Sequence, residues 1–270
     1  MLLTVLLILM GVVAGAAAGL FGIGGGLLFT PVLFYLFQTL GLEQPATWAI
    51  ATSLFCTFSA SLSSTIQQRK QKNLYWREGL WVGFAGSIAV FAGKSVVLSS
   101  WFSSRLFAGY FILLLIWVAV LFIRRSGAEY QTPAGRNQSR VGHFTVAGGA
   151  GGFIAALAGV GGGIVMVPIM NLMFQIPVRK AVSISSLAIV FISLSGWLQY
   201  ALLTDAPPGA SSVTLGYVDF GTALPLIAGA FIGGFAGVRL GKFVNQRLLY
   251  LLFALLITVI AISMLGELFG

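Results

Sequence analysis

Two glycine runs with the same pattern are the residues of this sequence best suited to bind a ligand. The first, GIGGG, occupies residues 22–26, and the second, GVGGG, occupies residues 159–163. An interior glycine costs a helix about 1 kcal/mol relative to alanine, so a helix breaks at such a run. The helix that restarts presents backbone N–H groups without intrahelical partners and the positive end of its dipole, and together these bind anions. The pattern predicts an anion site built from backbone, with two helix N-termini facing each other.

The candidate substrate-binding residues are the glycines of both runs and four hydroxyl side chains about two turns into the third helix of each half. They are Gly22, Gly24, Gly25, Gly26, Thr52, Ser53, Gly159, Gly161, Gly162, Gly163, Ser185 and Ser186. Pro31 and Pro168 follow the two runs at equivalent positions and are predicted to contribute to the helix breaks. A Ser or Thr hydroxyl in a helix also commonly donates to its own backbone, so both interpretations of the four hydroxyls stay open.

Glycines also serve close helix packing, which is the better interpretation of Gly15 and Gly19, because their spacing puts two small residues on one helix face. Three glycines in a row gain nothing for packing on one face, so the triple glycines favour a site. A dinucleotide-binding loop is the weakest interpretation. Neither run has the third glycine spacing, the preceding strand or the acidic residue that such a loop needs.

The ionisable residues offer little for catalysis. All six Asp and Glu residues lie in loops or at the ends of apolar segments, and His143, the single histidine, lies at a segment start. No carboxylate pair, metal cluster or catalytic triad can be assembled from them, so we expect neither an enzyme nor a cofactor.

Composition identifies the class of protein that must position these glycines. Hydrophobic residues make up 58% of the 270 residues and charged residues only 8%, whereas soluble domains carry about 25% charged residues. The net charge of +9 comes from Lys and Arg between apolar segments, as the positive-inside rule produces. A nucleic-acid surface would need a basic stripe interleaved with exposed aromatic residues. We therefore expect a membrane protein whose surroundings are lipid, with no nucleic-acid partner.

The chain is a duplication, because residues 15–37 align without gaps on residues 152–174. We expect an all-α integral membrane protein of two inverted-topology repeats, each a broken-helix hairpin followed by three transmembrane helices, with about ten helical segments in total. The expected domains are a first repeat (1–123), a cytoplasmic linker (124–142) and a second repeat (143–270). The predicted segments are residues 2–21, 27–40, 46–66, 79–98, 105–123, 143–158, 164–176, 180–203, 221–241 and 247–265.

Charge predicts that the repeats have opposite orientations. The loop after the third segment of the first half contains Arg69, Lys70 and further basic residues, whereas its counterpart contains Asp205 and Asp219 and no Lys or Arg. Because Lys and Arg are retained in cytoplasmic loops, these equivalent loops lie on opposite sides of the membrane. The sequence predicts a multi-pass protein of the inner (cytoplasmic) membrane with both termini outside.

The paired motifs GIGGGLLFTPVL and GVGGGIVMVPIM, the ATSL segment, and the NLYW and GYVDF stretches resemble the sulfite exporter TauE/SafE family over nearly the whole chain. The resemblance implies transport of sulfite, sulfonates, thiosulfate or related anions without a cofactor. It places the family motif on the glycines, hydroxyls and prolines named above. The chain departs from that motif at Ala51, Gln68 and Tyr75, where the family often has Gly, His and Asp.

The expected function is a secondary transporter that exports a small sulfur-containing anion, such as sulfite, an organosulfonate or thiosulfate, by alternating access around a midplane site. The expected partners are this inorganic or organic anion and membrane lipid. A channel-like anion facilitator is the main alternative, and a scaffold is a weaker one because it would not need duplicated helix breaks. Since no Asp, Glu or His lies in the middle of a segment, we expect export to run on the membrane potential.

Overall fold

The computed structural model shows an all-α membrane protein, as predicted. It describes residues 2–21, 25–70, 72, 74–126, 141–240, 255, 258–262 and 264–265. The helices are α1 (Leu2–Phe21), α2 (Gly26–Thr39), α3 (Pro45–Lys70), α4 (Trp76–Val97), α5 (Ser104–Ser126), α6 (Val141–Ala158), α7 (Gly163–Pro168), η1 (Ile169–Met173), α8 (Val178–Ala201) and α9 (Phe220–Leu240). A hairpin of two short antiparallel strands, β1 (Thr214–Leu215) and β2 (Val218–Asp219), precedes α9.

The apolar segments read from the sequence coincide with these helices. The segment 2–21 is α1 with unchanged bounds, and the segment 164–176 corresponds to α7 continued by the π-helix η1. The clearest shift is at α3, which continues past the predicted end at Ile66 to Lys70, because its last turn is helical but polar. The last predicted segment, 247–265, lies mostly outside the described residues, within which 258–262 are helical.

Several helices have the length and surface that a lipid bilayer requires. Among the described residues, α3, α4, α6 and α8 are long and apolar enough to cross a membrane, and α1, α2, α5 and α9 contain shorter apolar stretches. On α4, Phe84, Ile88 and Phe91 are each more than half exposed at helical spacing, so one face of this helix is apolar and outward. Trp76, the first residue of the same helix, and Trp101, in the loop after it, are also exposed, as in the aromatic belts of membrane proteins.

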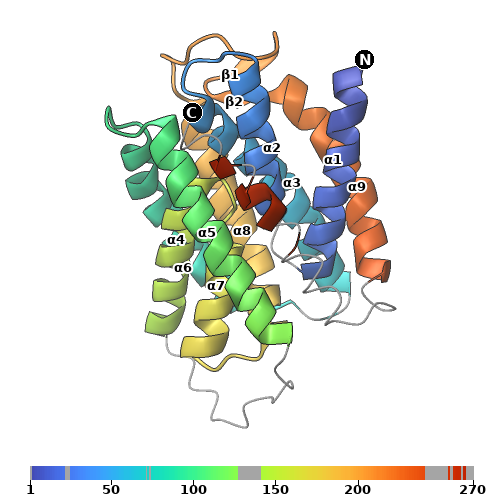
Figure 1. The fold of residues 1–270 in the computed structure, drawn as a ribbon. Coiled ribbons are helices and arrows are strands. Elements are labelled where there is room, and N and C mark those ends of the chain that lie inside the picture. The colour runs from blue at the N-terminus through green and yellow to red at the C-terminus, as the bar shows by residue number, and fades with distance from the viewer. Residues whose placement is uncertain are drawn as a thin grey trace.

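The two repeats run in opposite directions. Helix α1 begins at the end of the bundle that carries β1 and β2, whereas its counterpart α6 begins at the opposite end (Figure 1). Helix α3 begins beside the hairpin, where the rings of Trp48 and Tyr217 lie 5.4 Å apart. Its counterpart α8 ends there, with the Tyr217 N–H donating to Tyr200 O at 3.2 Å. Equivalent helices are therefore antiparallel.

The repeats also interlock. Helix α1 packs along α9 of the other repeat, and α6 packs along α4, while α3 and α8 pack against each other between these pairs. The helices approach through glycines: a Cβ placed on Gly15 would lie 2.2 Å from Ala230 O, and one on Gly152 would lie 2.0 Å from Gly86 O. The packing role predicted for Gly15 is confirmed, while the surroundings of Gly19 lie outside what the structure describes.

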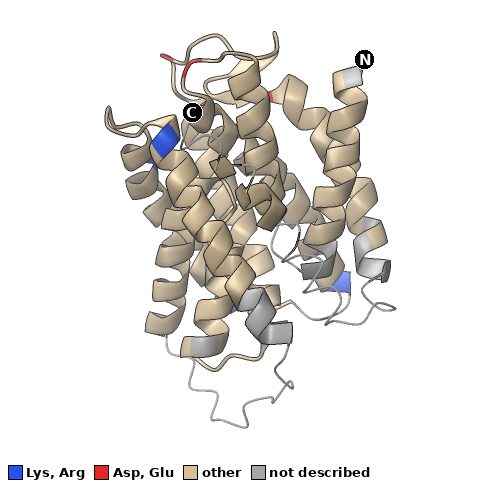
Figure 2. Ribbon diagram, in the orientation of Figure 1, with Lys and Arg blue, Asp and Glu red and all other residues tan. Residues whose placement is uncertain are grey.

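The two ends of the bundle differ in charge. We call the end with β1 and β2 the hairpin end, and the end where α3 finishes and α4 and α8 begin the basic end. Exposed Glu43 and Asp205 lie at the hairpin end, where Figure 2 shows the acidic residues in red. Lys94 and Arg105, in the last turn of α4 and the first of α5, lie there as well. The basic end carries Arg69, Lys70, Lys72, Arg77 and Lys180.

A buried carboxylate holds the hairpin end together. Asp219 is fully buried and accepts hydrogen bonds from the Ser211 N–H and hydroxyl, both at 2.8 Å. It also accepts from the Thr222 N–H at 2.9 Å and lies 3.2 Å from the Thr222 hydroxyl, as an N-cap residue does for the first turn of a helix. This carboxylate therefore ties the loop before β1 to the start of α9.

Candidate functional site

The second glycine run is a break between two helices. Helix α6 ends at Ala158 and α7 begins at Gly163. Between them Gly159, Gly161 and Gly162 have φ angles of +71°, +70° and +78°, which glycine adopts without the strain that a Cβ would cause. The N–H groups of Val165 and Met166 donate to Gly162 O at 3.1 and 3.0 Å. The N–H groups of the first two residues of α7 precede this first helical bond, so no carbonyl of their own helix can accept from them.

The first run restarts its helix in the same way. Gly25 precedes α2 with a φ of +73°, and its carbonyl accepts from the N–H groups of Leu28 and Phe29 at 3.0 and 3.3 Å. Gly25 and Gly162 are equivalent in the duplicated sequence, and they share both the N-cap position and the left-handed backbone. Gly22 and Gly24 lie outside the described residues.

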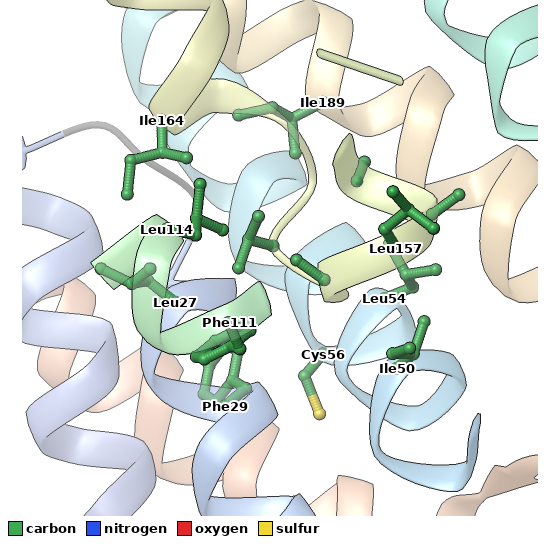
Figure 3. Packing of buried hydrophobic residues seen from close by; sticks show 14 of the residues in the cluster. Leu27, Phe29, Ile50, Leu54, Cys56, Phe111, Leu114, Leu157, Ile164 and Ile189 are labelled. Atoms are coloured by element: carbon green, nitrogen blue, oxygen red, sulfur yellow. The ribbon is translucent and has the colours of Figure 1, made fainter. Parts of the chain in front are cut away.

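The two breaks touch each other in the middle of the protein. A Cβ placed on Gly26, the first residue of α2, would lie 2.7 Å from Val160 Cα and 2.9 Å from Gly159 O. The backbones come this close because neither glycine has a side chain. Leu27 and Ile164, the second residues of α2 and α7, belong to one buried apolar cluster, and Leu114 of α5 lies between them in Figure 3. The breaks of both repeats thus form one buried region.

Hydroxyl groups bridge the two breaks. Ser53 on α3 donates a hydrogen bond to Gly159 O at 2.9 Å. The Thr30 hydroxyl lies 2.8 Å from Ser53 Oγ and 3.0 Å from Gly26 O, so its single proton is directed to one of these two acceptors. These contacts link α2 and α3 of the first repeat to the glycine run of the second.

The other predicted hydroxyls have different surroundings. Thr52 accepts a hydrogen bond from the Asp219 N–H at 3.1 Å, so it faces the hairpin end. Ser186 donates to Val182 O at 2.8 Å, within its own helix. Ser185 is fully buried, its hydroxyl has no hydrogen-bond partner in the described part of the chain, and it would lie 3.0 Å from a Cβ on Gly163. Of the four, the structure brings Ser53 and Ser185 to the glycine breaks.

Two further hydroxyls at the breaks were missed by the sequence analysis. Thr30 is described above, and Thr57, one turn after Ser53, is fully buried and its hydroxyl meets no hydrogen-bond partner among the described residues. A Cβ on Gly26 would lie 2.5 Å from Thr57 Oγ1. Thr30 sits inside the GIGGGLLFTP motif and could have been found there, whereas no sequence pattern distinguishes Thr57 from the other hydroxyls of α3.

The prolines act differently from the prediction. Helix α2 continues through Pro31 to Thr39, so Pro31 does not break it. Pro168 ends the α-helical part of α7, and the chain continues with π geometry in η1. In membrane helices a local change of helix type accommodates a proline that removes a backbone donor. Among the described residues, a left-handed glycine precedes each restarted helix, and the helix geometry changes at the proline only in the second repeat.

The site contains no charged side chain among the residues that the structure describes around the breaks. Asp219 is the one charged side chain in the described part of the chain that is fully buried, and its donors come from the hairpin-end loop and α9. At the basic end, Lys180 pairs with Glu78 at 3.2 Å and lies 4.9 Å from the centre of the Tyr75 ring. The breaks therefore offer neutral donors, N–H and O–H groups, which stabilise an anion without a buried cation.

Comparison with known proteins agrees with the membrane fold. The sequence pattern of the family described as Sulfite exporter TauE/SafE matches residues 7–264. A probable membrane transporter protein of Methanocaldococcus jannaschii is 29% identical over 266 residues, covering 98% of this chain and 96% of the relative. One of Bacillus subtilis is 28% identical over 285 residues, covering 97% of each chain. No solved structure matches. With paired glycine breaks inside an all-α membrane fold and a match over nearly its whole length, the chain belongs to the sulfite exporter TauE/SafE family.

Proposed function

We propose that this protein is a secondary transporter, not an enzyme, that exports a small sulfur-containing oxyanion, such as sulfite, an organosulfonate or thiosulfate, across the inner (cytoplasmic) membrane. The observation that carries the proposal is the meeting of the two glycine breaks. Each repeat contributes one helix start, Gly26 lies against Gly159 and Val160, and the nearby side chains are neutral hydroxyls. An anion held at this point receives hydrogen bonds from both halves, and movement of one half against the other changes its access.

Burial at the breaks supports alternating access over a channel-like facilitator. Gly25, Gly26, Ser53, Gly159 and Ser185 are all buried. A channel needs an aqueous path past its selective site in its conducting state, whereas a transporter passes through a closed state in which the site is shielded from both sides. The described residues at the breaks fit the closed state.

Charge at the two ends supports the orientation and the direction. The basic end is cytoplasmic by the positive-inside rule, which puts the start of α1 and the hairpin end outside. The C-terminus lies outside the described residues. The basic end carries the larger excess of positive charge and attracts anions, whereas at the hairpin end exposed Glu43 and Asp205 lie with Lys94 and Arg105. An inside-negative potential favours exit by about 2.3 kcal/mol per charge for each 100 mV.

The test is flux through the purified protein in liposomes. Vesicles loaded with sulfite receive an imposed potential that makes the lumen negative, and release is compared with that from protein-free vesicles. We expect release that rises with the potential, saturates with sulfite concentration and needs no sodium or pH gradient. Flux that stays proportional to concentration would support the facilitator instead. Movement driven only by an imposed sodium or proton gradient would contradict the proposed energy source.

A site variant accompanies this test. Gly26→Ala places a methyl group 2.5 Å from Thr57 Oγ1 and 2.7 Å from Val160 Cα, at a helical position where glycine is not needed for its φ. Gly149→Ala is the matched control, because a Cβ on this helical glycine meets nothing within 4 Å. We expect Gly26→Ala to lose sulfite binding and transport and Gly149→Ala to keep both. Equal transport by the two variants would show that the glycine breaks are not the substrate-binding site.

A further inference from the structure

Thr57 carries a buried hydroxyl at the meeting point of the two breaks. Its side chain is fully buried, and its Oγ1 has no hydrogen-bond partner among the residues that the structure describes. Two later hydroxyls on the same helix donate to their own backbone: Ser59 to Phe55 O at 3.2 Å and Ser61 to Phe58 O at 3.0 Å. An unpaired buried hydroxyl costs about 1–3 kcal/mol, so one that persists calls for an explanation.

The position of Thr57 gives its hydroxyl a specific direction. A Cβ on Gly26 would lie 2.5 Å from Thr57 Oγ1, and one on Gly161 would lie 2.6 Å from Thr57 Cγ2. Thr57 is thus held between the first residue of α2 and the glycine run of the other repeat. Its hydroxyl faces the first turn of α2, a helix of 14 residues, where the backbone N–H groups lack intrahelical acceptors.

A second unpaired hydroxyl stands at the other break. Ser185 on α8 is fully buried, its Oγ has no hydrogen-bond partner within the described ranges, and it lies 3.0 Å from the position of a Cβ on Gly163. Each repeat therefore directs one unsatisfied O–H group toward the first residue of the helix that restarts after its glycine run. The two groups come from opposite halves, α3 and α8, which pack against each other.

We propose that Thr57 is a substrate-binding residue and that its hydroxyl, together with that of Ser185, donates hydrogen bonds to different oxygen atoms of one bound oxyanion. Both unpaired hydroxyls gain a partner when the anion binds, and the anion gains one donor from each repeat. A ligand with several acceptor oxygens suits this arrangement better than a halide, which has a single acceptor atom. This inference rests on the proposed function, since it assigns a ligand contact within the same site.

The test compares Thr57→Val with Thr65→Val in the full-length purified protein. Valine keeps the shape of threonine and removes the donor. Thr65, further along α3, is also buried with an unpaired hydroxyl, but it lies two turns closer to the basic end. Binding of sulfite, sulfate and chloride is measured by calorimetry, and the apparent Tm without ligand is measured for each variant.

We expect Thr57→Val to weaken sulfite binding roughly 10- to 100-fold, as for a lost hydrogen bond to a charged group. Its Tm without ligand should not fall, because the lost hydroxyl had no partner. Thr57→Ser should restore binding, Ser185→Ala should weaken it similarly, and the affinity ratio of sulfite to chloride should drop in both weakened variants. Thr65→Val should bind as the wild type does.

The outcomes separate this inference from the proposed function. Unchanged sulfite affinity in Thr57→Val, with a wild-type protein that binds sulfite, overturns the role of Thr57 and leaves the transporter standing. A lower Tm without ligand, with unchanged affinity, assigns Thr57 to packing and also overturns it. A wild-type protein that binds none of these oxyanions contradicts the proposed function itself.

Discussion

Gly162→Ala tests whether the second break depends on glycine for more than its backbone angle. Two separate costs to the free energy of unfolding add at this residue, one from the backbone angle and one from steric overlap. Its φ of +78° is left-handed, which costs an L-residue about 1–2 kcal/mol. In addition, a Cβ would lie 2.1 Å from Gly151 O, where ordinary contact begins at 3.4 Å, so α6 and α7 must separate by about 1.3 Å, the difference of these distances. Overpacking of this kind costs about 1–3 kcal/mol more.

Gly41→Ala measures the cost of the left-handed backbone angle without the steric overlap. Gly41 has a φ of +71° and is exposed, and a Cβ there meets nothing within 4 Å. We expect both variants to lose stability, with Gly162→Ala losing about 1–3 kcal/mol more, which is about 2–12 °C in Tm at 2–4 °C per kcal/mol. Thermal unfolding in detergent and sulfite flux in liposomes are the assays. Equal Tm shifts with normal transport in both variants would refute the steric part of the reasoning.

Two other predictions use similarly matched positions. Ser212→Cys at the hairpin end should react with an impermeant thiol reagent added outside intact cells, whereas Lys70→Cys at the basic end should react only after permeabilisation. The native Cys56 is fully buried and adds no background labelling. Equal labelling of the two variants would contradict the inverted repeat. Gly152→Leu should destabilise the protein by several kcal/mol because α6 lies against the backbone of Gly86, whereas Gly149→Leu on the same helix should be tolerated. Thermal unfolding of the two variants measures the difference. A similar Tm for both variants would show that α4 and α6 can separate.

Local features of the sequence were enough to predict the helices. The segment 2–21 was predicted with its observed bounds, and both glycine runs were predicted as breaks, because hydropathy and glycine content act through neighbouring residues. The short strands β1 and β2 were not predicted, since two-residue strands leave no periodic pattern. The end of α3 was placed too early because its last turn is polar while its backbone remains helical.

The roles of the hydroxyls could not be predicted in the same way. Thr52 and Ser53 are adjacent in sequence, yet one accepts from Asp219 and the other donates to Gly159 O. Ser185 and Ser186 are adjacent as well, and only Ser186 donates to its own helix. Which partner a hydroxyl meets depends on the segment packed against it, and for Ser53 that segment is the glycine run between α6 and α7 of the other repeat. Hydropathy and spacing carry no information about this contact.

The packing of α1 on α9, and of α6 on α4, has a consequence for how the protein is made. Helix α1 is synthesised first and its partner α9 near the end of translation. The glycine-containing face of α1 therefore has no packing partner until almost the whole chain has been made. Contacts between residues so distant in sequence form late and slow the completion of a fold. The first repeat cannot supply these contacts by itself, because it lacks α9 and α6, the helices on which its α1 and α4 pack. The contact of α1 with α9 is therefore among the last to form, and a chain that ends after α5 contains two membrane helices without their packing partners.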